Sequence, residues 1–346
     1  MKKIFLIIII IFLFVTPVSA AEYEAPAAPE SAEKMLPPES KSFGEDLWYI
    51  IQNAIISLKP NLGQAIKICV SLISLIMLMS ILQTFSGISK QIAGLACTVS
   101  IALVLLEPSN AMIQLGAKTV NELSEYGKLL VPVLTASLAA EGGITQSAAL
   151  YAGTIFFNAL LCTGIAKLLT PMLYIYIVLC VANSALGNTI LQGLCDFVKW
   201  LMTWSLKIIL YVFTGYMGIT GVVSGITDAA ALKATKLTVS GMVPVVGGII
   251  SEASESILVS AGIMKNAVGV YGLLVIISLC IGPFLEIGIH YLLLKATTGI
   301  CGILGTKESV GLIKSFSGAA GFLLAMTGSV CIMLLISTVC FMKGFT

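Results

Sequence analysis

Residues 315–342 read SFSGAAGFLLAMTGSVCIMLLISTVCFM and contain no charged residue. An α-helix needs about 20 apolar residues to cross the roughly 30 Å hydrocarbon core of a bilayer, so this stretch predicts a transmembrane helix. Five further charge-free runs are long enough, and a sixth is shorter but rich in Leu, Val and Ile: Ile68–Ser89, Gly142–Ala166, Leu168–Cys195, Ile208–Thr227, Asn266–Leu285 and the shorter Gln91–Leu106. The sequence therefore predicts an all-α fold, a polytopic membrane helical bundle with about seven transmembrane helices.

The composition excludes a soluble globular protein. Of the 346 residues, 58% are apolar and only 10% are charged, whereas soluble domains carry about 25% charged residues. Every basic residue is a lysine. Arginine is the usual residue for bidentate contacts with phosphates and bases. Its absence argues against a nucleic-acid partner and leaves the lipid bilayer as the expected surroundings.

The N-terminus has the pattern of a secretory signal. Lys2 and Lys3 precede the 12 apolar residues Ile4–Val15, and small residues follow up to Ala20. Twelve residues are too few to span a bilayer as a helix. We expect a signal peptide over residues 1–20, cleaved after Ala20, which would leave the mature N-terminus extracytoplasmic. The alternative is an uncleaved first anchor.

Two segments of different character precede the first charge-free run. Residues 21–41 contain four prolines and five glutamates, and we expect a disordered extracytoplasmic tail because so little of it can be buried. Residues 42–59 predict an interfacial amphipathic helix. Its apolar positions recur at helical spacing: Leu47, Ile51, Ala54 and Ile55. The polytopic membrane domain is expected to comprise residues 42–346.

A second amphipathic helix is predicted over residues 112–126. Its less polar face is formed by Met112, Leu115, Thr119, Leu123 and Tyr126. The opposite face is formed by Gln114, Lys118, Asn121, Glu122 and Glu125.

Two apolar stretches, Leu129–Ala140 and Leu237–Ser251, are too short to be predicted as spans. Proline and paired glycines lie in or directly after them: Pro132, Gly142 and Gly143 for the first, and Pro244, Gly247 and Gly248 for the second. This pattern indicates a broken or re-entrant helix, which is tolerated only where protein or water covers the freed backbone groups. A kinked interfacial helix is the alternative. We treat these positions as candidate pore or packing positions.

The proline spacing suggests an internal repeat of residues 109–190 and 226–302. Pro132 and Pro244 are 112 residues apart, and so are Pro171 and Pro283. Three predicted spans separate the two units, and an odd number makes a repeat inverted, as in many transport folds. Coincidence is the alternative, because the chain has 11 prolines. Pro283 joins the candidate broken-helix positions.

The residues offer no enzyme chemistry. The chain has no G-x-x-x-x-G-K-[ST] phosphate loop, and its one histidine, His290, excludes a multi-histidine metal site. We therefore expect no catalytic residue, metal or cofactor. Glu286 and His290 are four residues apart, on one helix face, and are the candidate intramembrane polar residues. They suit either a proton relay or a hydrated carboxylate near the end of a span.

Several stretches resemble one known family. They are LLVPVLTASLAAEGGITQSAAL (129–150), PVVGGIISEASESILVSAGIMKNAVGVYG (244–272), MSILQTF (79–85) and KATKLTVSGMVPVVGG (233–248). These resemble the stage III sporulation protein AE family of endospore-forming Firmicutes, from about Leu47 to the C-terminus. The family has no established catalytic residues to carry over.

The resemblance implies a multi-pass protein of the mother-cell membrane around the engulfed forespore. It implies a membrane core, or an export-gate-like part, of a secretion-like channel complex that keeps the forespore active. The implied partners are other stage III sporulation membrane proteins, including a cytoplasmic secretion-type ATPase and ring-forming proteins between the two membranes. The alternative function is a stand-alone secondary transporter that uses inverted repeats and Glu286.

Overall fold

The computed structural model describes residues 25–38, 42–85, 90–187, 189–242 and 246–343. The predicted signal peptide, residues 1–20, lies outside this part of the chain. All described elements are helical: α2 (Glu30–Glu33), α3 (Phe43–Ser57), α4 (Lys59–Phe85), α5 (Lys90–Ala140), α6 (Ile144–Gly164), a π-helical turn (Ile165–Leu169), α7 (Thr170–Leu186), α8 (Thr189–Met242), α9 (Val246–Leu304) and α10 (Lys307–Met342). The predicted all-α class is confirmed.

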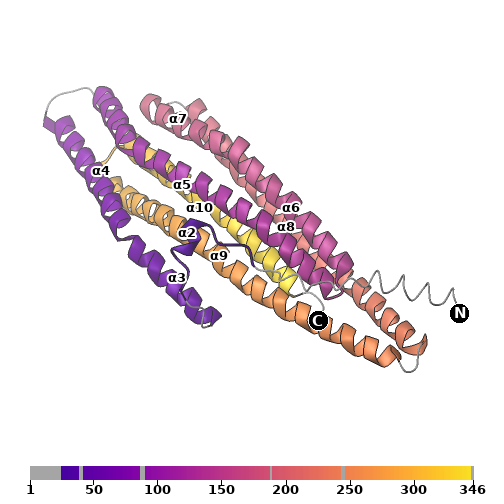
Figure 1. The fold of residues 1–346 in the computed structure, drawn as a ribbon. Helices are drawn as coiled ribbons and strands as arrows, with labels where there is room; N and C mark the ends of the chain where they lie inside the picture. The colour runs from indigo at the N-terminus through magenta and orange to yellow at the C-terminus, as the bar shows by residue number, and fades with distance from the viewer. Residues whose placement is uncertain (1–24, 39–41, 86–89, 188, 243–245, 344–346) are drawn as a thin grey trace.

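The long helices lie side by side in one elongated bundle (Figure 1). Helix α5 has 51 residues, α8 has 54 and α9 has 59. At 1.5 Å per residue α5 is about 76 Å long, more than twice the thickness of a hydrocarbon core of about 30 Å. A helix of this length crosses a bilayer and continues well beyond it.

Among the described residues, six helical segments are long and apolar enough to cross a membrane. The sequence predicted about seven. The difference arises because Gly142–Ala166 and Leu168–Cys195, predicted as two spans, do not form two crossings: α6 continues through the π-helical turn into α7 without reversing. The wider π turn directly precedes Pro171 and accommodates a residue that would otherwise break the helix.

Helix α5 also runs through a predicted break. Pro132 lies inside α5, so the prediction of a broken or re-entrant helix over Leu129–Ala140 is wrong. The helix ends at Ala140 instead. One missing backbone donor is tolerated there because the opposite face of the same turns is buried, as at Leu130 and Leu134.

In the second stretch, α8 ends at Met242 and α9 begins at Val246. Pro244 lies between them, outside the described residues. Gly247 and Gly248 belong to the first turn of α9.

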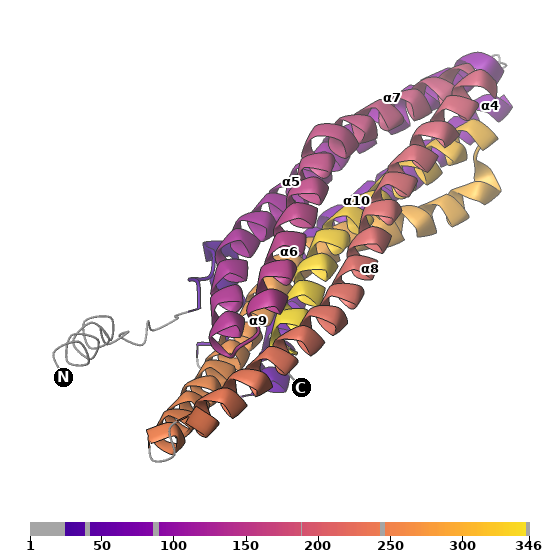
Figure 2. The ribbon, with the colours of Figure 1, turned by 90° about the vertical axis from the view of Figure 1, so that its right-hand side faces the viewer.

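Successive long helices alternate in direction (Figures 1 and 2). We call the end that holds the α4–α5, α7–α8 and α9–α10 connections the proximal end, and the opposite end the distal end. Helices α5 and α8, which begin the two proposed repeat units, both run from the proximal to the distal end. The expectation of an inverted relation is therefore wrong. Merging two predicted spans into α6–α7 changes the odd number of crossings between the units to an even one.

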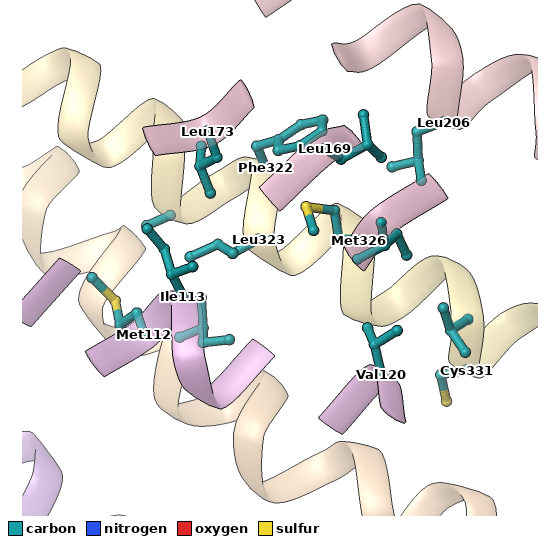
Figure 3. Packing of buried hydrophobic residues seen from close by; sticks show 14 of the residues in the cluster. Met112, Ile113, Val120, Leu169, Leu173, Leu206, Phe322, Leu323, Met326 and Cys331 are labelled. Carbon is teal, nitrogen blue, oxygen red and sulfur yellow. The ribbon is translucent and has the colours of Figure 1, made fainter. Parts of the chain in front are cut away.

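Helix α10 is the centre of the bundle and contacts α5, α6, α7, α8 and α9. Figure 3 shows its apolar side chains between α5, the α6–α7 helix and α8. Phe322, Leu323 and Met326 of α10 lie near Ile113 of α5 and Leu169 of the π turn, and all are buried. The C-terminal charge-free stretch is thus mostly an internal helix, surrounded by protein.

The predicted amphipathic helix at residues 42–59 is present as α3. Ser42 caps its first turn, since its hydroxyl accepts a hydrogen bond from the backbone N–H of Glu45 at 3.3 Å. The buried positions are Asp46, Ile50, Ala54 and Leu58, while Trp48 is 60% exposed. The buried face is rotated by about one residue from the predicted one, because Ile55 is exposed.

The segment before α3 differs from the disordered tail expected for residues 21–41. Residues 25–38 contact the bundle: α2 lies against α9, and Ala32 is fully buried. The Ser31 hydroxyl donates a hydrogen bond to the carboxylate of Glu122 in α5, with an O···O distance of 2.9 Å. The few apolar residues of this segment pack against the core of the bundle.

Helices α6 and α8 approach closely at Gly153, and this contact gives a first prediction. A Cβ atom at Gly153 would lie 2.0 Å from Cε1 of Tyr216, and the Tyr216 hydroxyl donates a hydrogen bond to the carbonyl of Ala149 at 3.0 Å. We expect Gly153→Ala to lower the free energy of unfolding by about 1–3 kcal/mol, because the ring must move.

Thermal unfolding of the purified protein in detergent measures this effect. Gly215→Ala is the matched control, since no atom lies within 4 Å of a Cβ at Gly215 and alanine favours a helix over glycine by about 1 kcal/mol. Equal unfolding temperatures for the two variants would contradict the packing described here.

Candidate functional site

Helix α5 exposes a continuous polar face in its middle. The residues of this polar stripe are all exposed: Glu107, Asn110, Gln114, Lys118, Asn121, Glu125 and Lys128. Their spacing of three or four residues keeps them on one side of the helix. From Glu107 to Lys128 the stripe is about 32 Å long, similar to the thickness of a hydrocarbon core.

The other side of α5 is buried, as the amphipathic pattern predicted. Met112, Thr119, Leu123 and Tyr126 are each at most 5% exposed, and Leu115 is half-buried. Packing of this side against the bundle fixes the direction in which the polar stripe points. The sequence prediction for residues 112–126 is therefore confirmed.

The polar stripe is poorly suited to lipid. A charged side chain in the middle of a bilayer costs about 2.5–3.5 kcal/mol on insertion scales. The stripe carries four charged residues, and the side chain of Lys118 is 72% exposed, although it pairs with Glu122 at 3.7 Å. Such a face needs water or a polar partner.

A cavity of about 240 Å³ lies beside the stripe, where α2, α3, α4, α5 and α9 meet. Its carboxylates are Glu122 of α5 and Glu286 of α9, and Asn61 of α4 also lines it. The Ser278 hydroxyl, on the α9 wall, is buried and has no hydrogen-bond partner within the described part of the chain. The cavity therefore brings polar groups from five helices together.

Of the two predicted intramembrane polar residues, only one lies at this cavity. Glu286 lines it, together with Pro283, which lies inside α9. His290 is one turn further along α9 and does not line it. In the described chain no hydrogen bond joins the two side chains. The structure thus keeps Glu286 as a candidate site residue and places His290 apart from it.

At the distal end, an ion pair joins the connection after α5 to α9. The Lys265 amine contacts the carboxylate of Glu141, and their side chains are 3% and 19% exposed. Glu141 directly precedes Gly142, whose φ of 104° is a backbone conformation that favours glycine. Gly143 then caps the start of α6. The predicted glycine positions therefore form a tight turn that presents Glu141 to Lys265.

The same region holds a close approach between α5 and α9. A Cβ atom at Gly272 would lie 2.7 Å from a methyl group of Leu130. Residues 129–150 and 244–272, the two longest stretches that carry the family resemblance, are thus in direct contact. Sequence reasoning missed this ion pair because a separation of 124 residues gives no local signal. The sequence indicated only that Glu141 and Lys265 are charged residues adjoining long apolar runs.

A set of small polar side chains between helices was also missed. Asn158 of α6 donates a hydrogen bond to the Ser124 hydroxyl of α5 at 3.3 Å. Thr154 of α6 donates to the Ser337 hydroxyl of α10 at 3.1 Å. All four residues are buried, so these bonds connect α6 to α5 and to α10 inside the bundle.

The described residues contain no group of three or more histidine, cysteine or acidic side chains that could hold a metal ion. All nine cysteines are unpaired, and only Cys340 is not fully buried. The thiols pack as small apolar groups.

The ion pair at the distal end gives a second prediction. Glu141→Gln should lower the free energy of unfolding by about 3 kcal/mol, because it removes the carboxylate charge that contacts the buried Lys265 amine. Lys265→Met should cost less, because the Glu141 carboxylate reaches water. The double variant should be more stable than the sum of the two losses predicts.

Chemical or thermal unfolding in detergent measures these differences. Lys118→Met is the control, because it removes an exposed pair that is worth at most about 1 kcal/mol. Losses that are equal for Glu141→Gln and Lys118→Met, or strictly additive in the double variant, would show that the pair does not stabilise the fold.

The family model described as stage III sporulation protein AE matches residues 35–344. The chain is similar to "Stage III sporulation protein AE" of Bacillus subtilis (strain 168), with 21% identity over 303 residues that cover 86% of this chain and 75% of that protein. No solved structure matches the chain significantly. The chain belongs to the stage III sporulation protein AE family.

Proposed function

We propose that this protein is a non-enzymatic membrane component of a secretion-like channel complex, in the mother-cell membrane that faces the engulfed forespore. Family membership implies a role in sporulation. The polar stripe of α5 is the observation that supports the finer proposal. An exposed polar face of about 32 Å on a bundle of membrane-crossing length is the surface that an aqueous path requires.

Several copies of this chain, or this chain and its partners, would surround the aqueous path, and the polar stripe would line it. The partners are other stage III sporulation membrane proteins, among them a cytoplasmic secretion-type ATPase and ring-forming proteins between the two membranes. The ATPase would supply the energy, since this chain offers no phosphate loop. The distal ion pair and the packing of the buried side of α5 hold the stripe in place within each chain.

Six crossings would place both ends of the membrane domain on the same side of the bilayer. Cleavage after Ala20 would leave the mature N-terminus extracytoplasmic, and the C-terminus would then be extracytoplasmic as well. The proximal end, with Lys307 after the α9–α10 connection, would face the cytoplasm. Lysines lie toward both ends of the bundle, with Lys265 at the distal end, so the orientation proposed here rests on the signal peptide and not on the usual charge bias of membrane proteins.

A stand-alone transporter with inverted repeats is less well supported, because α5 and α8 run in the same direction. Such a transporter is also expected to hold several coupled ionisable groups near the middle of the membrane. Glu286 lines the cavity beside the polar stripe, whereas His290 does not.

Complementation of a deletion strain tests the proposal. The double variant Gln114→Leu/Asn121→Leu should accumulate normally and yield far fewer heat-resistant spores than the intact gene, because apolar side chains would remove the wetted face. Ile175→Leu/Val178→Leu, at exposed apolar positions of α7, is the matched control and should sporulate normally. Glu286→Gln should also sporulate normally, since no proton transfer depends on it.

Two outcomes would contradict the proposal. Normal sporulation of Gln114→Leu/Asn121→Leu would show that the polar stripe is dispensable. Loss of spores in Glu286→Gln, at normal protein levels, would favour ion-coupled transport instead.

A further inference from the structure

At the proximal end, α7, α8 and α10 surround a polar cavity of about 550 Å³. It lies where α7 ends at Leu186 and α10 begins at Lys307. Uncharged hydrogen-bonding groups line it, among them Asn183 of α7 and Gln192 of α8. Its charged lining residues are Asp196, Lys199, Lys307, Glu308 and Lys314.

An apolar groove of about 650 Å³ continues along the bundle from this cavity. Its walls are side chains of α8, α9 and α10, including Leu206, Leu210, Phe284, Phe322 and Ile332. Glycines and alanines of α10 form its floor: Gly318, Gly321, Ala325 and Gly328. Two aromatic rings of α9 approach this floor: a Cβ atom at Gly321 would lie 3.0 Å from the Tyr291 ring, and one at Gly328 would lie 3.4 Å from the Phe284 ring.

The cavity and the groove meet at two polar side chains. Tyr176 of α7 and Lys199 of α8 line both spaces. A Cβ atom at Gly318 would lie 3.6 Å from the Tyr176 hydroxyl and 3.8 Å from the Lys199 amine. The amine and the hydroxyl therefore lie together at the boundary between a polar and an apolar space.

Positive charge exceeds negative charge around this boundary. Four lysines line the two spaces, Lys207 of the groove included, against the two acids Asp196 and Glu308. None of the four lysines forms an ion pair within the part of the chain that the structure describes. The lysines are thus available for an anionic ligand.

Aromatic side chains place the boundary at the surface of the membrane. Phe197, Trp200 and Trp204 follow one another along the exposed side of α8, with ring centroids 6.1 Å and 6.0 Å apart. Each is at least 50% exposed. Tryptophans on the outside of a membrane bundle mark the level of the lipid head groups. Lys199 is therefore at head-group level, and the groove runs from there toward the acyl region.

We propose that the cavity and the groove together bind one anionic phospholipid. The phosphate lies at Lys199 and Tyr176, with Lys307 and Lys314 near the rest of the head group, and an acyl chain lies along the groove floor. A free phosphate would leave the groove unfilled. A transmembrane helix would fill the groove but would leave the lysines of the cavity without partners, so the lipid matches both halves of the site.

Native mass spectrometry of the full chain in detergent tests this proposal, with phosphatidylglycerol, phosphatidylcholine and soluble glycerol 3-phosphate as probes. Phosphatidylglycerol should be retained and phosphatidylcholine should not. Lys199→Gln and Lys314→Gln should each weaken retention about fivefold. Gly328→Leu, which fills the groove, should weaken it while the protein remains folded.

Lys167→Gln is the matched control, since Lys167 is exposed on the π turn and lines neither space. Equal retention of the two lipids, or equal effects of Lys199→Gln and Lys167→Gln, would overturn the proposal. Competition by glycerol 3-phosphate as effective as that by the lipid would reduce the site to a phosphate site. A dimer that Gly328→Leu converts to a monomer would assign the groove to a second copy of the chain.

Discussion

Charge is costly to expose to hydrocarbon, and this constraint governs how α5 is placed in the bundle. One side of α5 is buried against its neighbours, and the opposite side carries the polar stripe. The buried side cannot rotate outward without exposing Tyr126 and the residues around it. The polar side must therefore face water or polar protein. Each chain thus carries a surface that lipid does not cover favourably.

The rest of the bundle holds that surface in a fixed position. Helix α10 lies at the centre and contacts five of the other long helices. Its small residues let the neighbours approach, as glycines do in many membrane bundles. At the distal end, Glu141 and Lys265 join the turn after α5 to α9. Because both partners are mostly buried, this pair contributes more to the position of α5 than an exposed pair would.

The N-terminal segment adds a second restraint on the same helix. Ser31 binds Glu122, and α3 covers part of α9. The cavity that contains Glu286 is closed by these elements rather than by the membrane helices alone. A change in the N-terminal segment would therefore alter the surroundings of Glu286 and of the polar stripe together.

Hydrophobic periodicity was sufficient to predict the helical class, the amphipathic helices and the two faces of α5. It failed where continuity of a helix depends on tertiary contacts. Pro132 does not break α5, and the π turn before Pro171 joins two predicted spans. Each proline is a strong local signal for a break in the helix, and tertiary packing overrides that signal. The long-range pair of Glu141 and Lys265 has no local signal at all.

The predicted relation between the two halves failed for the same reason. The number of crossings between the units was counted from charge-free runs, and one run too many was counted. An error of one crossing reverses the predicted direction of every later helix. By contrast, the paired glycines Gly142 and Gly143 were noted from the sequence because they directly follow an apolar stretch, and they lie in the turn between α5 and α6, where Gly142 has a positive φ.

Cysteine accessibility in intact membranes tests the central claim most directly. Gln114→Cys and Asn121→Cys on the polar stripe would be compared with Leu168→Cys and Ile208→Cys, which replace exposed apolar residues. A charged, membrane-impermeant thiol reagent should modify the stripe positions rapidly and leave the apolar positions unmodified, with the intact protein as the background control. Equal protection of all four positions, or equal reaction at all four, would contradict a water-facing stripe on α5.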